Sequence, residues 1–250
     1  MRFFCFIPLT ILSLLTTARA ETVRFCVGDW PPYTTVADDM VSGITVDIYR
    51  EALKSIGHEA AFMHVRWKRC LLHVQKGDFH AAADSGPREG FLQGPTFTAI
   101  FAQNIWVHND HPAQSYPGPS LMKNRRLGLV SAYVYPDEIE KDPAIILDYA
   151  ETDETNLRKL ALKRIDMALS DLVNSRIFVR KHNLPIRPLA PVVSINRLYP
   201  SFGPDHHDLQ ENMDKALRQM VDNGRLDLIY QAYLGISFTQ LQKLASSNSP

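Results

Sequence analysis

The pattern of apolar and polar positions divides the chain into short buried strands and amphipathic helices. Short apolar runs bounded by polar residues, such as Val23 to Val27 and Phe79 to Ala83, are typical of strands covered on both faces of a parallel sheet. Apolar residues recur at helical spacing from Ile44 to Ile56 and from Trp67 to Lys76, and a glycine directly follows each helix. This alternation predicts an α/β protein with a mainly parallel sheet.

The second half of the chain repeats the pattern. After an apolar extended run from Ile100 to Val107 and a Pro-rich connection over residues 111–120, we expect a strand at Leu127 to Val130. A helix at Asn156 to Lys163 and a strand at Ile165 to Leu169 follow. Each half contains a helix, an Asp, a short apolar strand and then a Ser and an Asp, which favours two similar lobes over one large sheet.

The C-terminal part predicts a crossover and two helices. The segment Ile186 to Pro204 carries four prolines and reads as a strand that crosses back. Helices are expected around Leu209 to Met220 and from Leu226 to Leu234. Beyond Gln240 the chain is polar, and we expect it to be frayed.

The first 20 residues predict a secretory signal peptide. A basic Arg2, an apolar core from Phe3 to Leu15 and the small residues Ala18 and Ala20 form the usual three regions, with cleavage before Glu21. No later segment approaches the roughly 20 apolar residues of a membrane-spanning helix. We therefore expect an exported protein, located in the periplasm.

Charge argues against a nucleic-acid partner. The chain has 27 basic and 27 acidic side chains, and removal of Arg2 and Arg19 with the signal leaves 25 against 27, a net charge near −2. Nucleic-acid binders usually carry a dominant basic face. The length fits one large or two small domains.

Two cysteines, Cys26 and Cys70, remain in the predicted mature chain, since Cys5 lies in the signal. Export places them in an oxidising compartment, where a disulfide or two separately buried thiols are both possible arrangements. We predict the disulfide.

Candidate binding residues gather at predicted strand ends. Ser85 and Arg88 follow the strand at residues 79–83, and ligands of open α/β sheets bind beyond such ends, although an ordinary loop is the alternative. Asp171 follows the matching strand of the second half. Trp30 and Tyr33 lie on a Pro-stiffened loop, as stacking surfaces or as a lid over the core. This set of complementary charges and aromatic rings fits a small zwitterion.

Other chemistries lack support. The sequence has no Gly-rich nucleotide loop and no Gly-x-Ser-x-Gly elbow, so we predict no cofactor. His206 with His207, and His108 with His111, are too loosely arranged to indicate a metal site, and we predict none.

Several segments together resemble a known family, the periplasmic solute-binding proteins of ABC importers for polar amino acids, or family 3 extracellular solute-binding proteins. The matching segments are Gly28 to Tyr33, Gly43 to Ile48, Trp67 to Leu71, Gly77-Asp78 with Ser85 to Arg88, Arg164 to Asp171, Met220 to Gly224 and Tyr233 to Gly235.

The resemblance implies a two-lobed periplasmic-binding-protein fold of type II. Each lobe would be a mainly parallel sheet flanked by helices, and two crossover strands would join them. The first lobe would take residues 21–99 with 200–250, and the second residues 100–199. The lobes would close on a small-molecule ligand, and the monomeric protein would deliver it to the membrane permease of an ABC importer.

The resemblance also implies site roles. Arg88 would bind a ligand carboxylate, with the Ser85 hydroxyl just before it, Asp171 would bind an α-amino group, and Tyr33 would stack on the ligand. Two departures concern ligand contacts. Ala81 and Ala83 replace small polar residues before Arg88, and Ala132-Tyr133 replaces a Gly-Thr pair that faces the carboxylate, so Tyr133 is a further candidate contact.

Two other functions share this fold. An exported enzyme similar to cyclohexadienyl dehydratases would need a poised carboxylic acid, and Asp84 and Asp29 are the candidates, but neither lies in a catalytic motif. A ligand-sensing partner of a membrane receptor would use the same binding chemistry. We predict a binding protein rather than an enzyme.

Overall fold

The computed structural model describes residues 21–38 and 40–247. The predicted signal peptide, residues 1–20, lies outside the described residues. Within them, no helix is long and apolar enough to cross a membrane.

The first group of strands contains β1 (Thr22–Val27), β4 (Glu59–His64) and β5 (Ala81–Ser85), in the order β4-β1-β5 and all parallel. Two helices, α1 (Ile44–Ser55) and α2 (Trp67–Gln75), connect them. All five residues of β5 are buried, which explains their small size. The predicted alternation of strand and helix is confirmed here.

The second group contains β7 (Arg126–Val130), β8 (Ile146–Ala150) and β9 (Met167–Asp171). β7 pairs in parallel with both of its neighbours. The helices α4 (Asp153–Ala161) and α5 (Leu172–His182) precede and follow β9. The second half is therefore also an α/β unit, as predicted.

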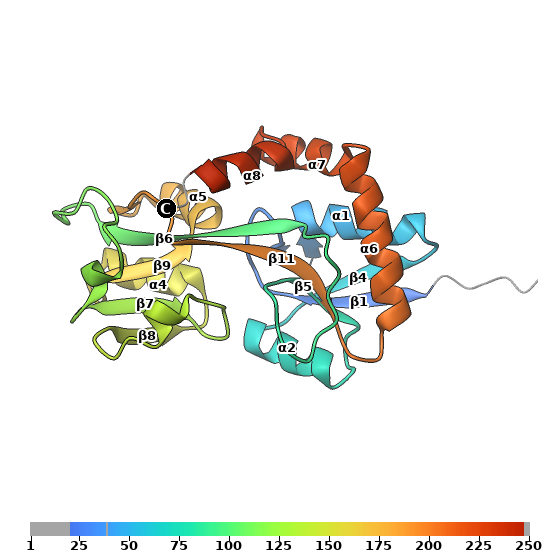
Figure 1. Cartoon of the computed structure of the whole chain (residues 1–250), viewed down its shortest axis with the longest axis horizontal. Helices are drawn as coiled ribbons and strands as arrows, with labels where there is room; N and C mark the ends of the chain where they lie inside the picture. Colours follow the sequence, from blue (N-terminus) through green and yellow to red (C-terminus); the bar gives the residue numbers. More distant parts are fainter. Residues whose placement is uncertain (1–20, 39, 248–250) are drawn as a thin grey trace, which may run out of the picture.

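Two long strands, β6 (Ala99–His108) and β11 (Ser194–Phe202), run between the two groups (Figure 1). They are antiparallel to each other, and β11 pairs with β6 along residues 194–198 and with β5 along residues 199–202. The short β10 (Ile186–Pro188) also pairs with β6. The sheet order β4-β1-β5-β11-β6-β9-β7-β8 is thus continuous, and the predicted mixed α/β fold is confirmed.

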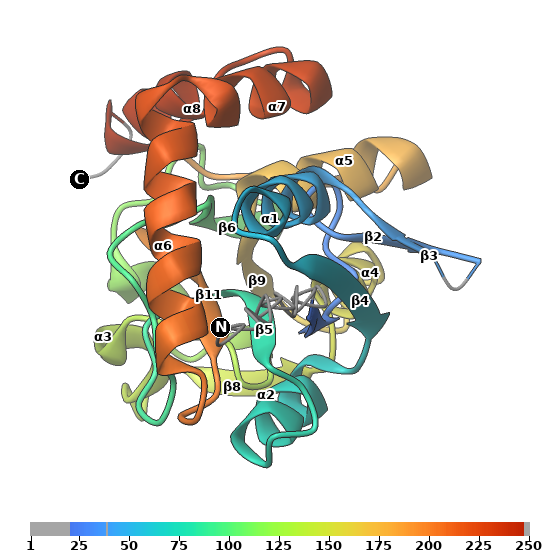
Figure 2. The ribbon, with the colours of Figure 1, turned by 90° about the vertical axis from the view of Figure 1, so that its right-hand side faces the viewer.

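Three helices end the chain: α6 (His207–Asp222), α7 (Arg225–Leu234) and α8 (Phe238–Ser247). Figure 2 shows α6 upright beside the sheet, with α7 and α8 across its end. α8 was not predicted, since the tail seemed too polar. Phe238 anchors it, with 3% of its surface exposed and its ring centroid 4.8 Å from that of Tyr230.

Smaller elements occupy the connections. β2 (Thr35–Ala37) and β3 (Met40–Ser42) form a separate antiparallel hairpin, which projects from the body in Figure 2. The 3-10 helix η1 (Pro119–Met122) and the one-turn helix α3 (Asp137–Glu140) lie before and after β7.

A disulfide joins Cys26 of β1 to Cys70 of α2, with Cα atoms 5.5 Å apart. Both residues are buried in a small cluster with Leu71, Val74 and Phe79. The predicted bridge is therefore present, and it fixes α2 against β1, whose Cys26 pairs with Ala82 near the start of β5.

Candidate ligand-binding site

A pocket lies where the end of β5 faces the loop after β7. The cavity has a volume of about 70 Å³. Of the described residues that line it, two carry a formal charge, Asp84 and Arg88, and four are aromatic. The lining consists of Gly28, Trp30, Thr34, Trp67, Ala83, Asp84, Gly86, Arg88, Phe101, Tyr133, Val134, Asn196 and Leu198.

Arg88 follows the end of β5 by three residues. Its Nε donates to the Ser85 hydroxyl at 3.0 Å, and its Nη2 donates to the carbonyl oxygen of Ala132. Burial lowers the pKa of Arg88, although a guanidinium remains charged. No carboxylate of the described residues lies within 4.0 Å of the guanidinium, so its charge is open to an anion.

The Ala132 carbonyl connects the two strand groups. It accepts hydrogen bonds from Arg88 and from the indole Nε1 of Trp67, the latter at 3.3 Å. A second contact between the groups joins the Asn174 amide to the Pro31 carbonyl oxygen at 2.7 Å. The pocket is therefore bounded by residues from both groups that already contact each other.

Trp30 lines the pocket and Tyr33 does not. The two rings stack, with centroids 4.1 Å apart and planes 18° from parallel. In the described part of the chain neither the Trp30 Nε1 nor the Tyr33 hydroxyl has a hydrogen-bond partner. Burial raises the pKa of Tyr33 well above its ordinary value, so the phenol stays neutral.

Tyr133 lines the pocket from the loop after β7. Its hydroxyl donates to Asp153 at 3.3 Å, and its ring stands edge-on to Phe101 with centroids 5.4 Å apart. Burial raises the pKa of Tyr133 well above its ordinary value. The side chain therefore serves the pocket as a neutral aromatic wall.

Asp171 is fully buried and caps α5. Its carboxylate accepts from the backbone N–H of Asn174 at 2.7 Å and of Ala102 at 3.2 Å, and it does not line the pocket. Burial raises its pKa to about 7. Of the six predicted ligand contacts, Arg88, Trp30 and Tyr133 line the pocket, whereas Ser85, Tyr33 and Asp171 do not. Ser85 is connected to the pocket through its hydrogen bond to Arg88.

Asp84 lines the pocket, whereas sequence reasoning considered it only as an enzyme acid. Its carboxylate accepts hydrogen bonds from three hydroxyls: Thr45, Tyr49 at 3.0 Å and Thr98 at 3.3 Å. Burial raises its pKa to about 6. The other candidate acid, Asp29, does not line the pocket and accepts from a backbone N–H at 3.0 Å.

Trp67, Phe101 and Asn196 were also missed as lining residues. Trp67 lies in a segment that carries the family resemblance, which is the one signal that could have found it. Phe101 and Asn196 lie within β6 and β11, and a strand pattern does not tell which residues face a pocket between two groups.

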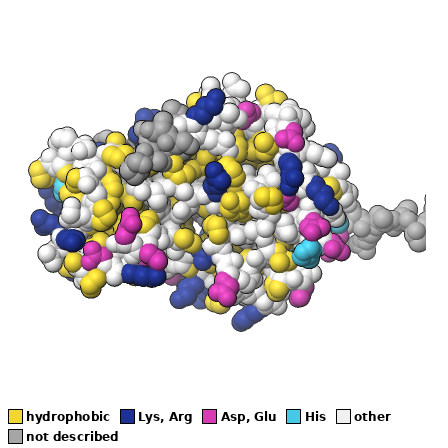
Figure 3. All heavy atoms as spheres, in the orientation of Figure 1, with side chains coloured by type: hydrophobic (Ala, Val, Ile, Leu, Met, Phe, Trp, Pro, Cys, Tyr) yellow, Lys and Arg dark blue, Asp and Glu magenta, His cyan; other side chains and the backbone are white. Residues whose placement is uncertain are grey.

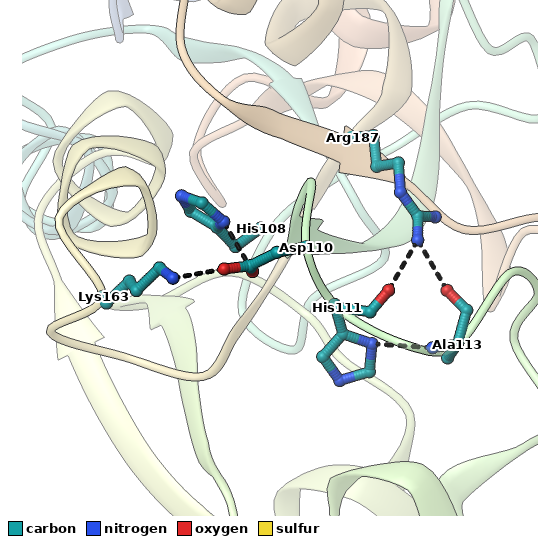
Figure 4. Close-up of polar contacts among 6 residues, drawn as sticks. All are labelled: His108, Asp110, His111, Ala113, Lys163 and Arg187. Carbon is teal, nitrogen blue, oxygen red and sulfur yellow. Dashed lines mark hydrogen bonds and ion pairs between the residues drawn. The ribbon is translucent and has the colours of Figure 1, made fainter.

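His108 and His111 contact separate partners (Figure 4). His108 contacts Asp110 through Nδ1 at 2.7 Å, and Lys163 binds the same carboxylate. His111 accepts from the backbone N–H of Ala113 at 3.2 Å. In the described ranges, no group of three or more His, Cys, Asp or Glu side chains could hold a metal ion.

The visible face carries no single-sign charge patch. Figure 3 shows Lys and Arg side chains interspersed with Asp and Glu over both ends of the molecule. The mixture of charges on this face agrees with the near-neutral sequence.

Solved structures share the fold. A histidine kinase sensor domain with similarity to periplasmic binding proteins has 19% identity and a TM-score of 0.79, over 88% of this chain and 98% of that one. A putative L-cystine ABC transporter from Listeria monocytogenes has 17% identity and a TM-score of 0.75, over 87% and 98%. An ancestral arginine-binding protein bound to arginine has 16% identity and a TM-score of 0.75, over 86% and 99%.

At these identities the structures define the fold, a periplasmic-binding-protein fold of type II. A comparison of the sequence with curated proteins found no match. A family model matches residues 23–236, nearly the whole predicted mature chain. The protein therefore has a ligand-binding role outside the cytoplasm, and the chain belongs to the bacterial extracellular solute-binding proteins, family 3.

Proposed function

We propose that the mature protein binds a small polar solute with a carboxylate group in the periplasm and delivers it to the permease of an ABC importer. The observation that carries this proposal is the Arg88 guanidinium, which lines the pocket without a carboxylate partner among the described residues. A planar guanidinium can bind a carboxylate through two parallel hydrogen bonds. Of the similar structures, one is named as an arginine-binding protein and another as a putative L-cystine ABC transporter, which supports this ligand class.

Binding would be coupled to closure of two lobes, residues 21–99 with 200–250 and residues 100–199. β11 pairs with β5 of the first strand group, β6 pairs with β9 of the second, and the two strands pair with each other, which supports a hinge there. A ligand that contacts both lobes favours the closed arrangement by its differential affinity for it. The monomeric protein would thus present a closed, loaded form to the permease.

The other contacts would have distinct roles. Ser85 would hold Arg88 in position through the hydrogen bond to its Nε, and Trp30 and Tyr133 would cover the ligand with aromatic rings. Tyr33 and Asp171 are proposed as contacts on the family resemblance alone, because both side chains lie outside the pocket lining.

The test is a thermal-shift screen of amino acids and related small acids, followed by calorimetry on Arg88→Ala. Loss of a desolvated charge partner costs about 2 to 5 kcal/mol, a loss of tens to thousands of fold in affinity. Arg225→Ala is the matched control, since it removes a half-exposed arginine that pairs with Glu51 on the surface. If Arg88→Ala binds the solute as tightly as wild type, the carboxylate assignment is wrong.

A second candidate is a ligand-sensing partner of a membrane receptor. The histidine kinase sensor domain, with a TM-score of 0.79, is the observation that favours it. Uptake of a labelled solute by cells that lack the protein separates the two, because an importer subunit is needed for uptake and a sensor is needed only for the response. We expect no enzymatic activity, and no release of phenylpyruvate from prephenate.

A further inference from the structure

We infer that a groove formed by β6, β11, the loop between β5 and β6, and α8 is a second binding site, which takes a small amphipathic anion with an apolar body. This site goes beyond the proposed function and does not rest on it. The groove is distinct from the pocket that Arg88 lines, although Asn196 lines both. Its lining consists of Pro87, Phe97, Ile100, Ile195, Asn196, Arg197, Tyr199 and Gln242.

The alternation of side chains along the two strands separates the groove from the pocket. On β11, Leu198 lines the pocket and its neighbour Arg197 lines the groove. On β6, Phe101 lines the pocket and its neighbour Ile100 lines the groove. Because neighbouring residues of a strand point to opposite faces of a sheet, the two cavities lie on opposite faces of the same pair of strands.

Arg197 supplies the charge of the groove. Of the described residues that line the groove, it is the one with a formal charge. The residue is exposed, and no carboxylate of the described residues lies within 4.0 Å of its guanidinium. A guanidinium stays positive at physiological pH and can bind a carboxylate or a phosphate through two parallel hydrogen bonds. The groove therefore favours an anion.

Aromatic rings beside Arg197 give the groove an apolar surface. The guanidinium carbon of Arg197 lies 4.9 Å from the centroid of the Phe97 ring, an attractive arrangement of a cation over an aromatic face. The ring of Tyr199 stands edge-on to Phe97 with centroids 6.2 Å apart, and Phe238 of α8 packs against Phe97 at 5.4 Å. These rings and the buried Ile100 lie next to one cation, which suits an anionic head joined to an apolar body.

The size of the groove fits a small molecule. Its volume is about 670 Å³, within the range of roughly 300 to 1,000 Å³ that is usual for ligand sites. Eight of the described residues line it, whereas a protein partner contacts roughly 20 to 30 residues. α8, which contributes Gln242, begins at Phe238, after the end of the family match at residue 236. The groove therefore includes an element outside the matched residues.

The experiment titrates octanoate into the predicted mature chain, residues 21–250, and follows backbone amide signals by NMR. The signals of Ile100 and Arg197 should shift, and those of Gly28 and Trp67, which line the pocket, should not. We expect a dissociation constant of about 5 mM or below for a ligand of this size. Octan-1-ol and octyltrimethylammonium, which lack the anionic head, should cause far smaller shifts. If octanoate shifts no groove signal, or if either analogue binds as well, the inference is overturned.

Variants then assign the binding to the groove. Arg197→Gln should weaken octanoate binding about 5-fold or more, since it removes the cation. Arg158→Gln is the matched control, because Arg158 is also exposed and its guanidinium carbon also lies 4.9 Å from a Phe ring, that of Phe178, but it does not line the groove. If Arg197→Gln does not fold, Gln242→Glu, which adds a negative charge to the groove, should weaken binding instead. Equal binding by wild type and the groove variant overturns the inference.

Arg88→Ala separates the two sites, since octanoate is itself a carboxylate. This variant should bind octanoate as wild type does, because Arg88 does not line the groove. Loss of octanoate binding in Arg88→Ala, with binding kept in Arg197→Gln, would assign the acid to the pocket and overturn this inference while leaving the proposed function intact. A dimer in solution that Arg197→Gln dissociates would show that a second copy of the chain covers the groove, and it would overturn the inference as well.

Discussion

Asp153→Asn should change how the stability of the protein depends on pH. The Asp153 carboxylate lies at the start of α4, with 5% of the residue exposed, and accepts from the hydroxyls of Ser170 and Tyr133. Burial raises its pKa from the ordinary value of 3.8 to about 6. The folded protein therefore binds this proton at a higher pH than the unfolded chain does.

The sign of the effect follows from proton linkage. Between about pH 7 and pH 4 the folded state binds more protons than the unfolded state at this site, so its contribution to stability increases as the pH falls. For a shift from 3.8 to about 6, the increase is about 2 kcal/mol between pH 8 and pH 4.5. The amide of the variant does not titrate and loses this contribution.

Urea unfolding of wild type and Asp153→Asn at pH 8, 6 and 4.5 measures the effect. The difference in unfolding free energy between the two proteins should change by about 2 kcal/mol over this range, with wild type gaining toward acid pH. Asp84, whose pKa burial also raises, and His80, whose pKa burial lowers, titrate in both proteins and cancel. Asp171, whose pKa burial and the nearby Asp153 charge raise to about 7, cancels only in part, because the variant lacks that charge.

Asp148→Asn is the matched control. A hydrogen bond from Lys159 holds the pKa of Asp148 below its ordinary value, so this group stays ionised throughout the range and the difference from wild type should stay nearly constant. A pH-independent difference for Asp153→Asn as well would refute the reasoning about burial.

Three further outcomes are expected. Replacing Cys26 and Cys70 by Ala should lower the free energy of unfolding by about 4 kcal/mol, since the disulfide spans a sequence separation of 44; an unchanged urea midpoint would contradict this. Arg88→Ala should abolish solute-induced compaction in small-angle scattering while the circular dichroism spectrum stays unchanged, and compaction equal to wild type would count against hinge closure through Arg88. Gly128→Ala should cost about 1 to 3 kcal/mol in thermal unfolding, because its Cβ would lie 2.9 Å from the Asn156 side chain; a neutral effect would mean that this region relaxes freely.

The fold was largely predictable because its strands and helices follow simple patterns. The run at residues 79–83 predicted β5, although the strand begins two residues later, at Ala81. α5 was missed because its buried face includes the polar residues Asn174 and Ser175, so apolar residues do not recur at helical spacing. α8 was missed because one buried residue, Phe238, anchors an otherwise polar segment.

The site was predictable only in part, because strand ends indicate position but not side-chain direction. Arg88 was found by its place after β5. Asp84 was considered only as the acid of an enzyme, yet both Ala83 and Asp84 line the pocket, whereas neighbouring residues in a regular strand face opposite ways. The backbone of Asp84 has a φ of 51°, in the left-handed region, and this departure from strand geometry is not visible in a sequence. Asp171 was assigned to the ligand from its place at a strand end and from the family resemblance; its additional contact as the cap of α5 was not foreseen, because that helix was not predicted.

In the proposed binding mode, the Ala132 carbonyl competes with the solute for the hydrogen-bond donors of Arg88 and Trp67. An anion that takes the Nη2 of Arg88 or the indole N–H of Trp67 must replace a bond already made within the chain, so its measured affinity reports only the difference between the two bonds. When the solute dissociates, the Ala132 carbonyl can accept hydrogen bonds from Arg88 and Trp67 again, which would lower the barrier to dissociation. A protein that delivers its solute to a permease, as proposed here, would gain from this internal hydrogen-bond acceptor, because tight recognition of the solute then need not mean slow release.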